Sequence, residues 1–338
     1  MLTLGWVSGK KSTVAQRKMS ELAALIGRRA EIEIGARAYE TYDELTQTTY
    51  RGETDLAWLP PISFLVLVRE HAIAPLAAAR AVPYKSAIIV ASSSPFAKPG
   101  SLLGTRAAWV DRHSASGYVV PRTKFARLGI DPRTAFGSEQ FYETHDAVVA
   151  AVAQGSADFG ATWARVEKRE TTGPWSRSPH DVRVLATFGS IPPDVLAARA
   201  DLTKPARKAI VAALKTIYEE RQSRWLLRDV LNTEAFYRPR LELYGPLQEV
   251  VVDAYRSGIL DAPSMPPPAA EPPPKAERRL AMRTMETQPR VHHASVPDLV
   301  GDEDGADVDA LLQTTDTHRW SLPEIEVDID VDVDVSFE

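Results

Sequence analysis

The chain has 338 residues, of which 44% are hydrophobic, with a formal net charge of −5 and no cysteine. This length allows two lobes and a further segment, and the absence of cysteine excludes disulfides, thiolate catalysis and cysteine-ligated metals. No run of about twenty apolar residues occurs, so the sequence predicts no direct insertion into a membrane. No basic run interleaved with aromatic residues points to a nucleic-acid partner.

The charge is unevenly distributed along the chain. From Pro263 onward, 6 Lys+Arg stand against 17 Asp+Glu, whereas residues 1–262 have 34 Lys+Arg against 28 Asp+Glu. A mildly basic body suits the capture of a small anion.

Strand-like and helix-like segments alternate along residues 1–262. Hydrophobic patterning predicts strands over residues 2–7, 31–34, 56–59, 86–92 and 107–110, and helices over residues 12–26, 41–50, 62–70, 206–218 and 246–257. Alternation of this kind predicts an α/β fold with largely parallel sheets.

Two segments carry candidate ligand-binding residues. The first, Ser114-Ala115-Ser116-Gly117-Tyr118, follows the strand over residues 107–110 and opens a helix. A helix start presents free N–H groups, hydroxyls and the positive dipole end to one point, which suits an oxyanion. Ser114 and Ser116 could equally be plain helix caps. The second segment places His145 at the start of another helix, where it could donate to the same anion.

Six segments in chain order carry a family resemblance: residues 52–61 (GETDLAWLPP), 83–90 (PYKSAIIV), 114–118 (SASGY), 144–148 (THDAV), 155–161 (GSADFGA) and 191–194 (IPPD). They resemble the phosphate/phosphite/phosphonate substrate-binding proteins of ABC importers, which have the two-lobed type II periplasmic-binding-protein fold. The resemblance spans about residues 2–255. It implies one lobe from residues 1–87 and 188–262, a second from residues 88–187, and a ligand clasped between them.

The resemblance also implies which residues bind the ligand. Hydroxyl, phenol, imidazole and backbone N–H donors would hold the oxyanion, and Asp194 would accept a proton from a protonated ligand oxygen. The residues expected at the ligand are Tyr42, Tyr84, Ser114, Ala115, Ser116, Gly117, Tyr118, His145 and Asp194. The alternatives are a half-buried strand aromatic for Tyr84, a surface aromatic for Tyr42, a solvent-facing residue for His145 and a loop cap for Asp194. No cofactor and no metal is expected.

Three positions depart from the family pattern. Arg165 stands where aminophosphonate-binding relatives carry an acidic residue that pairs with the ligand amine, so a more anionic ligand is expected here. Trp163 either walls the pocket or packs in the core. Ala115 stands where the family often has a hydroxyl, so one donor is lost.

The composition changes after Asp261, and seven of the twelve residues from Pro263 to Pro274 are proline. We predict a Pro-rich linker over residues 263–297 and a largely disordered acidic tail over residues 298–338. Carboxylates alternate with Val and Ile over residues 324–335. This pattern fits a solvated tail, or a strand that adds to the sheet of a protein partner.

The expected function is non-enzymatic binding of a phosphate-, phosphite- or phosphonate-type oxyanion by a solute-binding or sensor protein. Two alternatives remain open: a regulatory protein with a vestigial cleft that acts through its acidic tail, and an enzyme of the menaquinone- or thiamine-precursor type on the same fold. The first residues lack the features of a secretory signal. This predicts a cytoplasmic location, or a periplasmic one if the N-terminus was trimmed.

Overall fold

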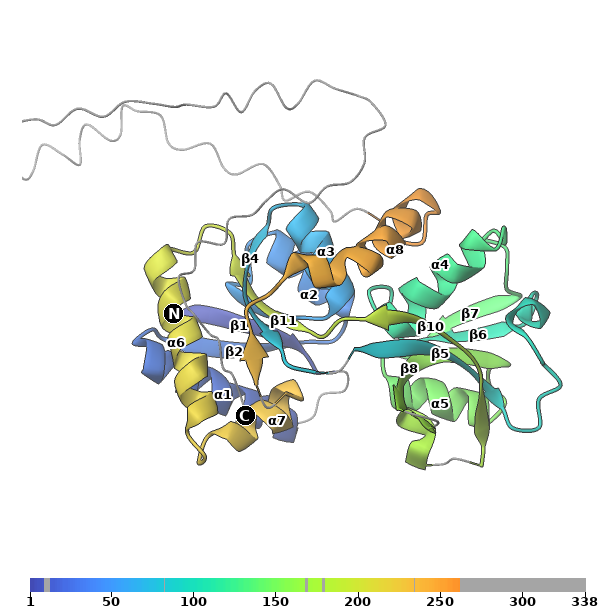
Figure 1. Ribbon diagram of the computed structural model, residues 1–338, viewed down its shortest axis with the longest axis horizontal. Helices are drawn as coiled ribbons and strands as arrows, with labels where there is room; N and C mark the ends of the chain where they lie inside the picture. Colours follow the sequence, from blue (N-terminus) through green and yellow to red (C-terminus); the bar gives the residue numbers. More distant parts are fainter. Residues whose placement is uncertain (9–12, 82, 168–169, 178–179, 234, 262–338) are drawn as a thin grey trace, which may run out of the picture. The chain divides into compact units, whose positions relative to one another are not determined.

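The computed structural model describes residues 1–8, 13–81, 83–167, 170–177, 180–233 and 235–261, and these residues form two α/β lobes (Figure 1). The predicted linker and acidic tail lie outside the described residues. Within the described part of the chain, no helix is long and apolar enough to cross a membrane.

Lobe 1 is built on a sheet with the strand order β12-β4-β11-β3-β1-β2. Its strands are β1 (Leu2–Val7), β2 (Ile34–Tyr39), β3 (Leu56–Leu59), β4 (Ile73–Ala79), β11 (Val195–Arg199) and β12 (Phe236–Tyr237). Its helices are α1 (Thr13–Ala30), α2 (Tyr42–Tyr50), α3 (Pro61–Arg69), α6 (Lys204–Glu219) and α7 (Arg224–Leu231). The β1 strand pairs in parallel with β2 and β3, whereas β11 pairs antiparallel with β3 and β4.

Lobe 2 is built on a sheet with the order β10-β5-β8-β6-β7, and β9 pairs with β8. Its strands are β5 (Tyr84–Ala91), β6 (Arg106–Trp109), β7 (Ser138–Phe141), β8 (Phe159–Glu167), β9 (Glu170–Thr172) and β10 (Val182–Ile191). Its helical segments are η1 (Pro99–Leu102), the π-helical turn η2 (Ala115–Val119), α4 (Val120–Arg127), α5 (His145–Ala153) and η3 (Pro174–Arg177).

Each lobe has its own hydrophobic core. In lobe 1, Met19, Leu22 and Ile26 lie on one face of α1 and are at most 2% exposed, as an amphipathic helix against a sheet requires. In lobe 2, the ring of Trp109 packs edge-on against Phe159, with centroids 5.4 Å apart. Burial of one large apolar side chain contributes about 1.5–3 kcal/mol. Because each lobe has its own hydrophobic core, each lobe can support one wall of the cleft between them.

The chain crosses between the lobes before β5 and again between β10 and β11. A third connection follows lobe 1 and consists of η4 (Leu241–Tyr244) and α8 (Gly245–Arg256). Helix α8 contacts α3 of lobe 1 and α4, β10 and η2 of lobe 2. The predicted lobe boundaries, after residues 87 and 187, fall inside β5 and β10; the lobe assignment by residue range stays a prediction.

Two expectations about secondary structure need correction. The strand predicted over residues 31–34 is β2, which begins only at Ile34, because Glu31 has a left-handed backbone with φ 55° that ends α1 in a turn. The sheets are also less parallel than expected. Strands β5 and β8 pair antiparallel, and β11 runs antiparallel to β3 because the chain re-enters lobe 1 from lobe 2.

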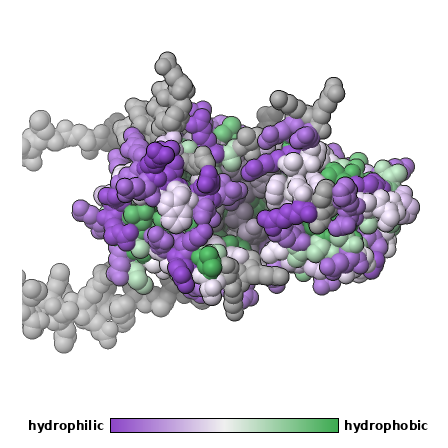
Figure 2. Space-filling model, turned by 90° about the horizontal axis from the view of Figure 1, so that it is seen from below, coloured by the Kyte–Doolittle hydropathy of each residue, from purple (hydrophilic) through white to green (hydrophobic). Residues whose placement is uncertain are grey.

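The surface shown in Figure 2 is mainly hydrophilic, and its hydrophobic side chains are small and separate spots. Scattered apolar residues of this kind are normal on a protein surface and mark no interface.

Candidate functional site

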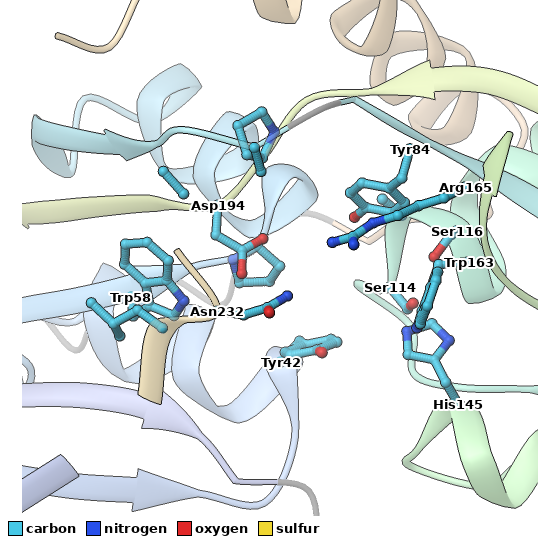
Figure 3. Close-up of a pocket in the computed structure, with 16 residues that line it drawn as sticks. Tyr42, Trp58, Tyr84, Ser114, Ser116, His145, Trp163, Arg165, Asp194 and Asn232 are labelled. Carbon is cyan, nitrogen blue, oxygen red and sulfur yellow. The ribbon is translucent and has the colours of Figure 1, made fainter. Parts of the chain in front are cut away.

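A cavity of about 410 Å³ lies between the two lobes and is lined by residues of both. Figure 3 shows the side chains that surround it. The lining residues are Tyr42, Trp58, Pro60, Ala79, Ala81, Tyr84, Ser114, Ala115, Ser116, His145, Trp163, Arg165, Pro193, Asp194, Leu231 and Asn232.

The π-helical turn η2 supplies the hydroxyls of Ser114 and Ser116. The Gly117 N–H donates to Ser114 Oγ at 3.1 Å, so Ser114 caps the turn while its own hydroxyl hydrogen remains available to the cavity. Ser86 Oγ donates to the Ser116 carbonyl oxygen at 2.7 Å and fixes the turn to β5. Ser114 therefore fits both interpretations that the sequence left open, the cap and the cavity-facing donor.

His145 is the first residue of α5, and its Nδ1 lies 2.9 Å from Thr162 Oγ1 on β8. Burial penalises the imidazolium form and lowers the pKa of His145 to about 4, so the ring is neutral at pH 7. When the Thr162 hydroxyl donates to Nδ1, the hydrogen of the ring resides on Nε2. His145 then offers the cavity an uncharged N–H donor.

Two phenols complete the set of neutral donors. Tyr42 is the first residue of α2 and Tyr84 the first of β5. Burial raises the pKa of both phenols, and the negative charge of Asp194 raises them further. Both phenols thus keep their protons at neutral pH and can donate hydrogen bonds.

Asp194 and Asn232 lie on the lobe 1 side of the cavity (Figure 3). Burial raises the pKa of Asp194 to about 7, although a hydrogen bond from the indole of Trp58 opposes the rise. Asn232 follows α7 with a left-handed backbone, φ 51°. Non-glycine residues held in this region often belong to functional sites.

Trp163 and Arg165 are two residues apart on β8, so their side chains lie on the same face of the strand, and both line the cavity. The guanidinium carbon of Arg165 lies 5.8 Å from the centroid of the Trp163 ring. Arg165 is exposed, and it is the one Lys or Arg among the described lining residues. The open question about Trp163 is resolved in favour of the pocket wall.

Seven of the nine predicted site residues line the cavity, and Gly117 and Tyr118 do not. Gly117 packs against Val110 outside the lining of the cavity, since a Cβ atom at this position would be 2.4 Å from Val110 Cγ2. Its N–H donates to Ser114 Oγ. Tyr118 is 4% exposed and packs against the rings of Trp109 and Phe141. That Gly117 and Tyr118 contact the ligand stays a prediction, which their positions outside the lining do not support.

Seven lining residues were not predicted to contact a ligand: Trp58, Pro60, Ala79, Ala81, Pro193, Leu231 and Asn232. The last two, Leu231 and Asn232, come from the part of lobe 1 that follows lobe 2. They end α7, which was not predicted at all. An asparagine directly after a leucine-rich helix is a known signal for a left-handed helix cap, and this signal could have revealed the helix end. It could not have revealed that the cap faces Asp194.

The two lobes also touch directly beside the cavity. The backbone N–H of Tyr42 in lobe 1 donates to Asp111 Oδ2 in lobe 2 at 3.2 Å. Asp43 Oδ1 lies 3.5 Å from Nδ1 of His113, which is 4% exposed. Burial raises the pKa of Asp111 to about 6.

Among the described residues, no group of three His, Asp or Glu side chains could hold a metal ion. The cavity instead offers hydrogen-bond donors from two separate α/β lobes, which is the architecture of the two-lobed proteins that bind a solute in a cleft. The chain belongs to the family described as the phosphonate periplasmic substrate-binding proteins of ABC transporters, which matches residues 4–244. The resemblance inferred from the sequence is confirmed.

Solved structures share this fold at low sequence identity. A binding-protein component of an ABC phosphonate transporter, PA3383 from Pseudomonas aeruginosa, superposes with a TM-score of 0.62 at 19% identity, covering 83% of this chain and 94% of that chain. PhnD1 from Prochlorococcus marinus in complex with methylphosphonate gives 0.62 at 15% identity, covering 77% and 98%. XAC2383 from Xanthomonas citri, bound to ATP, gives 0.64 at 17%, covering 76% and 98%. These likenesses confirm the fold.

Proposed function

We propose that the cavity binds one small phosphorus oxyanion of the phosphonate, phosphite or phosphate type. The observation that carries the proposal is the presence of Ser114, Ser116 and His145 of lobe 2 around the same cavity as the phenols of Tyr42 and Tyr84. The methylphosphonate complex of the Prochlorococcus relative supports the same ligand class.

Neutral donors suit this ligand for an energetic reason. A hydrogen bond to a charged acceptor contributes about 1.5–3 kcal/mol, and a micromolar dissociation constant corresponds to about −8 kcal/mol. Several such bonds, minus the loss of freedom on association, therefore suffice for micromolar binding. The loss of any one of them is large enough to measure.

The protein acts by binding rather than by turnover. His145 is hydrogen-bonded to Thr162 and not to a carboxylate, so it lacks the partner that would raise its basicity. The carboxylate next to it in the sequence, Asp146, is exposed, and its Oδ2 lies 3.8 Å from Nη1 of Arg177. These contacts favour a solute-binding component over an enzyme.

The family is one of periplasmic transporter components, which supports the periplasmic location over the cytoplasmic one that the sequence suggested. A periplasmic protein of this family would deliver its ligand to a membrane permease, and that permease is then its partner. A protein partner of the acidic tail stays a prediction.

Calorimetric titration of the full chain, refolded to remove any carried ligand, tests the proposal. The titrants are phosphate, phosphite, methylphosphonate, 2-aminoethylphosphonate and sulfate. We expect a micromolar or tighter dissociation constant for at least one phosphorus compound and an unchanged ³¹P spectrum of that ligand after incubation. No binding of any phosphorus oxyanion by the cooperatively folded protein overturns the proposed function, and a changed spectrum restores the enzyme alternative.

A further inference from the structure

The cavity holds one guanidinium without a carboxylate partner. Among the described residues, no ion pair includes Arg165, and the indole of Trp163 is its ring contact at 5.8 Å. Asp194, the one carboxylate among the described lining residues, makes no ion pair with it either. Figure 3 shows the Arg165 side chain extended into the cavity. A charged group presented to a binding cavity in this way is available to a ligand.

Arg165 lies away from His145 along strand β8. Thr162, which holds His145, is three residues before Arg165 on β8, or about 10 Å of strand. The register that pairs Lys85 with Ala164 places Arg165 opposite Tyr84 at the start of β5. The guanidinium thus belongs to a second part of the cavity, at the Tyr84 end and away from His145.

The volume leaves room for a substituent in that second part. A tetrahedral oxyanion occupies roughly the space of three water molecules, about 90 Å³, whereas the cavity measures about 410 Å³. Besides the polar donors, the cavity is lined by Trp58, Trp163 and Leu231, together with the amide of Asn232. A short carbon chain with a polar end fits these walls.

We propose that the ligand is a carboxyalkylphosphonate, whose phosphonate group binds Ser114, Ser116 and His145 and whose carboxylate pairs with Arg165. This inference rests on the proposed function. The guanidinium fork matches a carboxylate with two parallel hydrogen bonds. One guanidinium neutralises the single charge of a carboxylate, whereas a second phosphoryl group would bring two charges to a cavity with no other Lys or Arg among its described lining residues.

Asp194 is the group that would favour an amine instead. Its carboxyl already accepts a hydrogen bond from the Trp58 indole, and burial raises its pKa to about 7, so the acid form is well populated at neutral pH. In that form Asp194 donates to an anionic oxygen and gives an ammonium group no counter-charge. Arg165 in the same cavity repels an ammonium group.

Three phosphonates of similar size distinguish these ligands: 3-phosphonopropionate, propylphosphonate and 2-aminoethylphosphonate. Each is titrated into the full-length wild type, Arg165→Gln and the matched control Arg133→Gln, whose arginine is 75% exposed and paired with Asp131. We expect wild type to bind 3-phosphonopropionate at least tenfold more tightly than propylphosphonate. Arg165→Gln should abolish this difference and leave propylphosphonate affinity within twofold, and Arg133→Gln should change nothing.

Equal or tighter binding of propylphosphonate or 2-aminoethylphosphonate by wild type overturns the inference and leaves the proposed function standing. Equal weakening of all three ligands in Arg165→Gln also overturns it, since Arg165 would then contact the phosphonate group itself. If none of the three binds, while phosphate and phosphite do not bind either, the proposed function fails and this inference with it. Melting curves verify that Arg165→Gln folds, and Arg165→Lys, which keeps the charge without the fork, is expected to retain an intermediate preference.

Discussion

The two walls of the cavity differ in how their polar groups are held. On the lobe 2 wall, hydrogen bonds within the lobe fix the donors: Ser114 is held by Gly117, the Ser116 backbone by Ser86, and His145 by Thr162. The lobe 1 wall presents Asp194, whose pKa is raised to about 7, and Asn232, whose backbone is left-handed. The Ser114, Ser116 and His145 donors of lobe 2 are preorganised and neutral, with Arg165 as the charged group of that wall, whereas Asp194 of lobe 1 changes charge near neutral pH.

This difference suggests a division of roles. Preorganised donors lose little conformational freedom when a ligand arrives, so they provide most of the affinity. A carboxyl that titrates near pH 7 provides little affinity but makes binding depend on pH. Substitutions on each wall of the cavity test this division.

His145→Ala should weaken binding of the phosphorus oxyanion most. It removes a charge-assisted hydrogen bond from a buried position and leaves the Thr162 hydroxyl without its partner, at a cost of about 1.5–3 kcal/mol, or roughly 10- to 150-fold in dissociation constant. Calorimetry measures the change. His180→Ala, an exposed histidine of the same lobe, serves as control and should bind as wild type does. Affinity unchanged in His145→Ala would remove His145 from the site.

Ser116→Ala should weaken binding by about 1–2 kcal/mol, roughly 5- to 30-fold. The effect is smaller because the carbonyl contact with Ser86, which positions the turn, involves only the backbone of residue 116 and survives the substitution. The exposed Ser156→Ala is the matched control. A melting temperature near that of wild type, together with unchanged affinity, would contradict the assignment.

Asp194→Asn tests the lobe 1 wall through stability. Between the ordinary pKa of 3.8 and the folded value of about 7, the folded protein keeps a proton that the unfolded chain releases, so stability falls as pH rises through this window. The stability of Asp194→Asn does not fall for this reason, because asparagine has no proton to release in this pH range. Its ligand-free melting temperature should exceed that of wild type more at pH 8 than at pH 4, whereas Asp201→Asn, at an exposed aspartate, should not show this trend. A pH-independent difference would contradict the raised pKa.

The same variant should also flatten the pH dependence of binding. In wild type, Asp194 becomes ionised above about pH 7 and repels an oxyanion, so affinity should decrease from pH 6 to pH 8 more in wild type than in Asp194→Asn. Because both proteins are titrated with the same ligand, the ionisation of the ligand contributes equally to both pH dependences. Parallel curves for the two proteins would show that Asp194 does not face the bound anion.

Asp111→Asn should have the smallest measurable effect. The carboxylate accepts the N–H of Tyr42 across the lobes, and an amide oxygen accepts the same bond without the charge. We expect affinity to fall by no more than about threefold, or about 0.6 kcal/mol. A tenfold loss, measured by calorimetry, would instead make this interlobe contact a major determinant of closure.

Truncation after residue 261 should change affinity least of all. The described lining residues all precede residue 233, so removal of the Pro-rich and acidic segment leaves them in place. Calorimetry with the same ligand as for the full chain measures the difference. A folded truncated protein that no longer binds would show that this segment takes part in the site.

The features that could be predicted from the sequence are those that depend on residues close together in the chain. The alternation of strand and helix patterns identified the α/β fold, and six short segments in order identified the family. Thr41 and Thr144, whose hydroxyls accept the N–H groups of Glu44 and Ala147, mark the starts of α2 and α5. Caps and periodicity act over a few residues, which is why Tyr42, Ser114 and His145 could be recognised as helix-start residues.

Which of these residues come together depends on how distant segments pack in the folded protein. Gly117 and Tyr118 lie one and two positions beyond Ser116, yet packing against Val110 and Trp109 places them behind the wall. Asn232 lines the cavity only because the chain comes back to lobe 1 after it has formed lobe 2. The pKa values of Asp194 and His145 follow from burial by segments far away in sequence. Burial and contact between distant segments depend on packing, which no local pattern encodes.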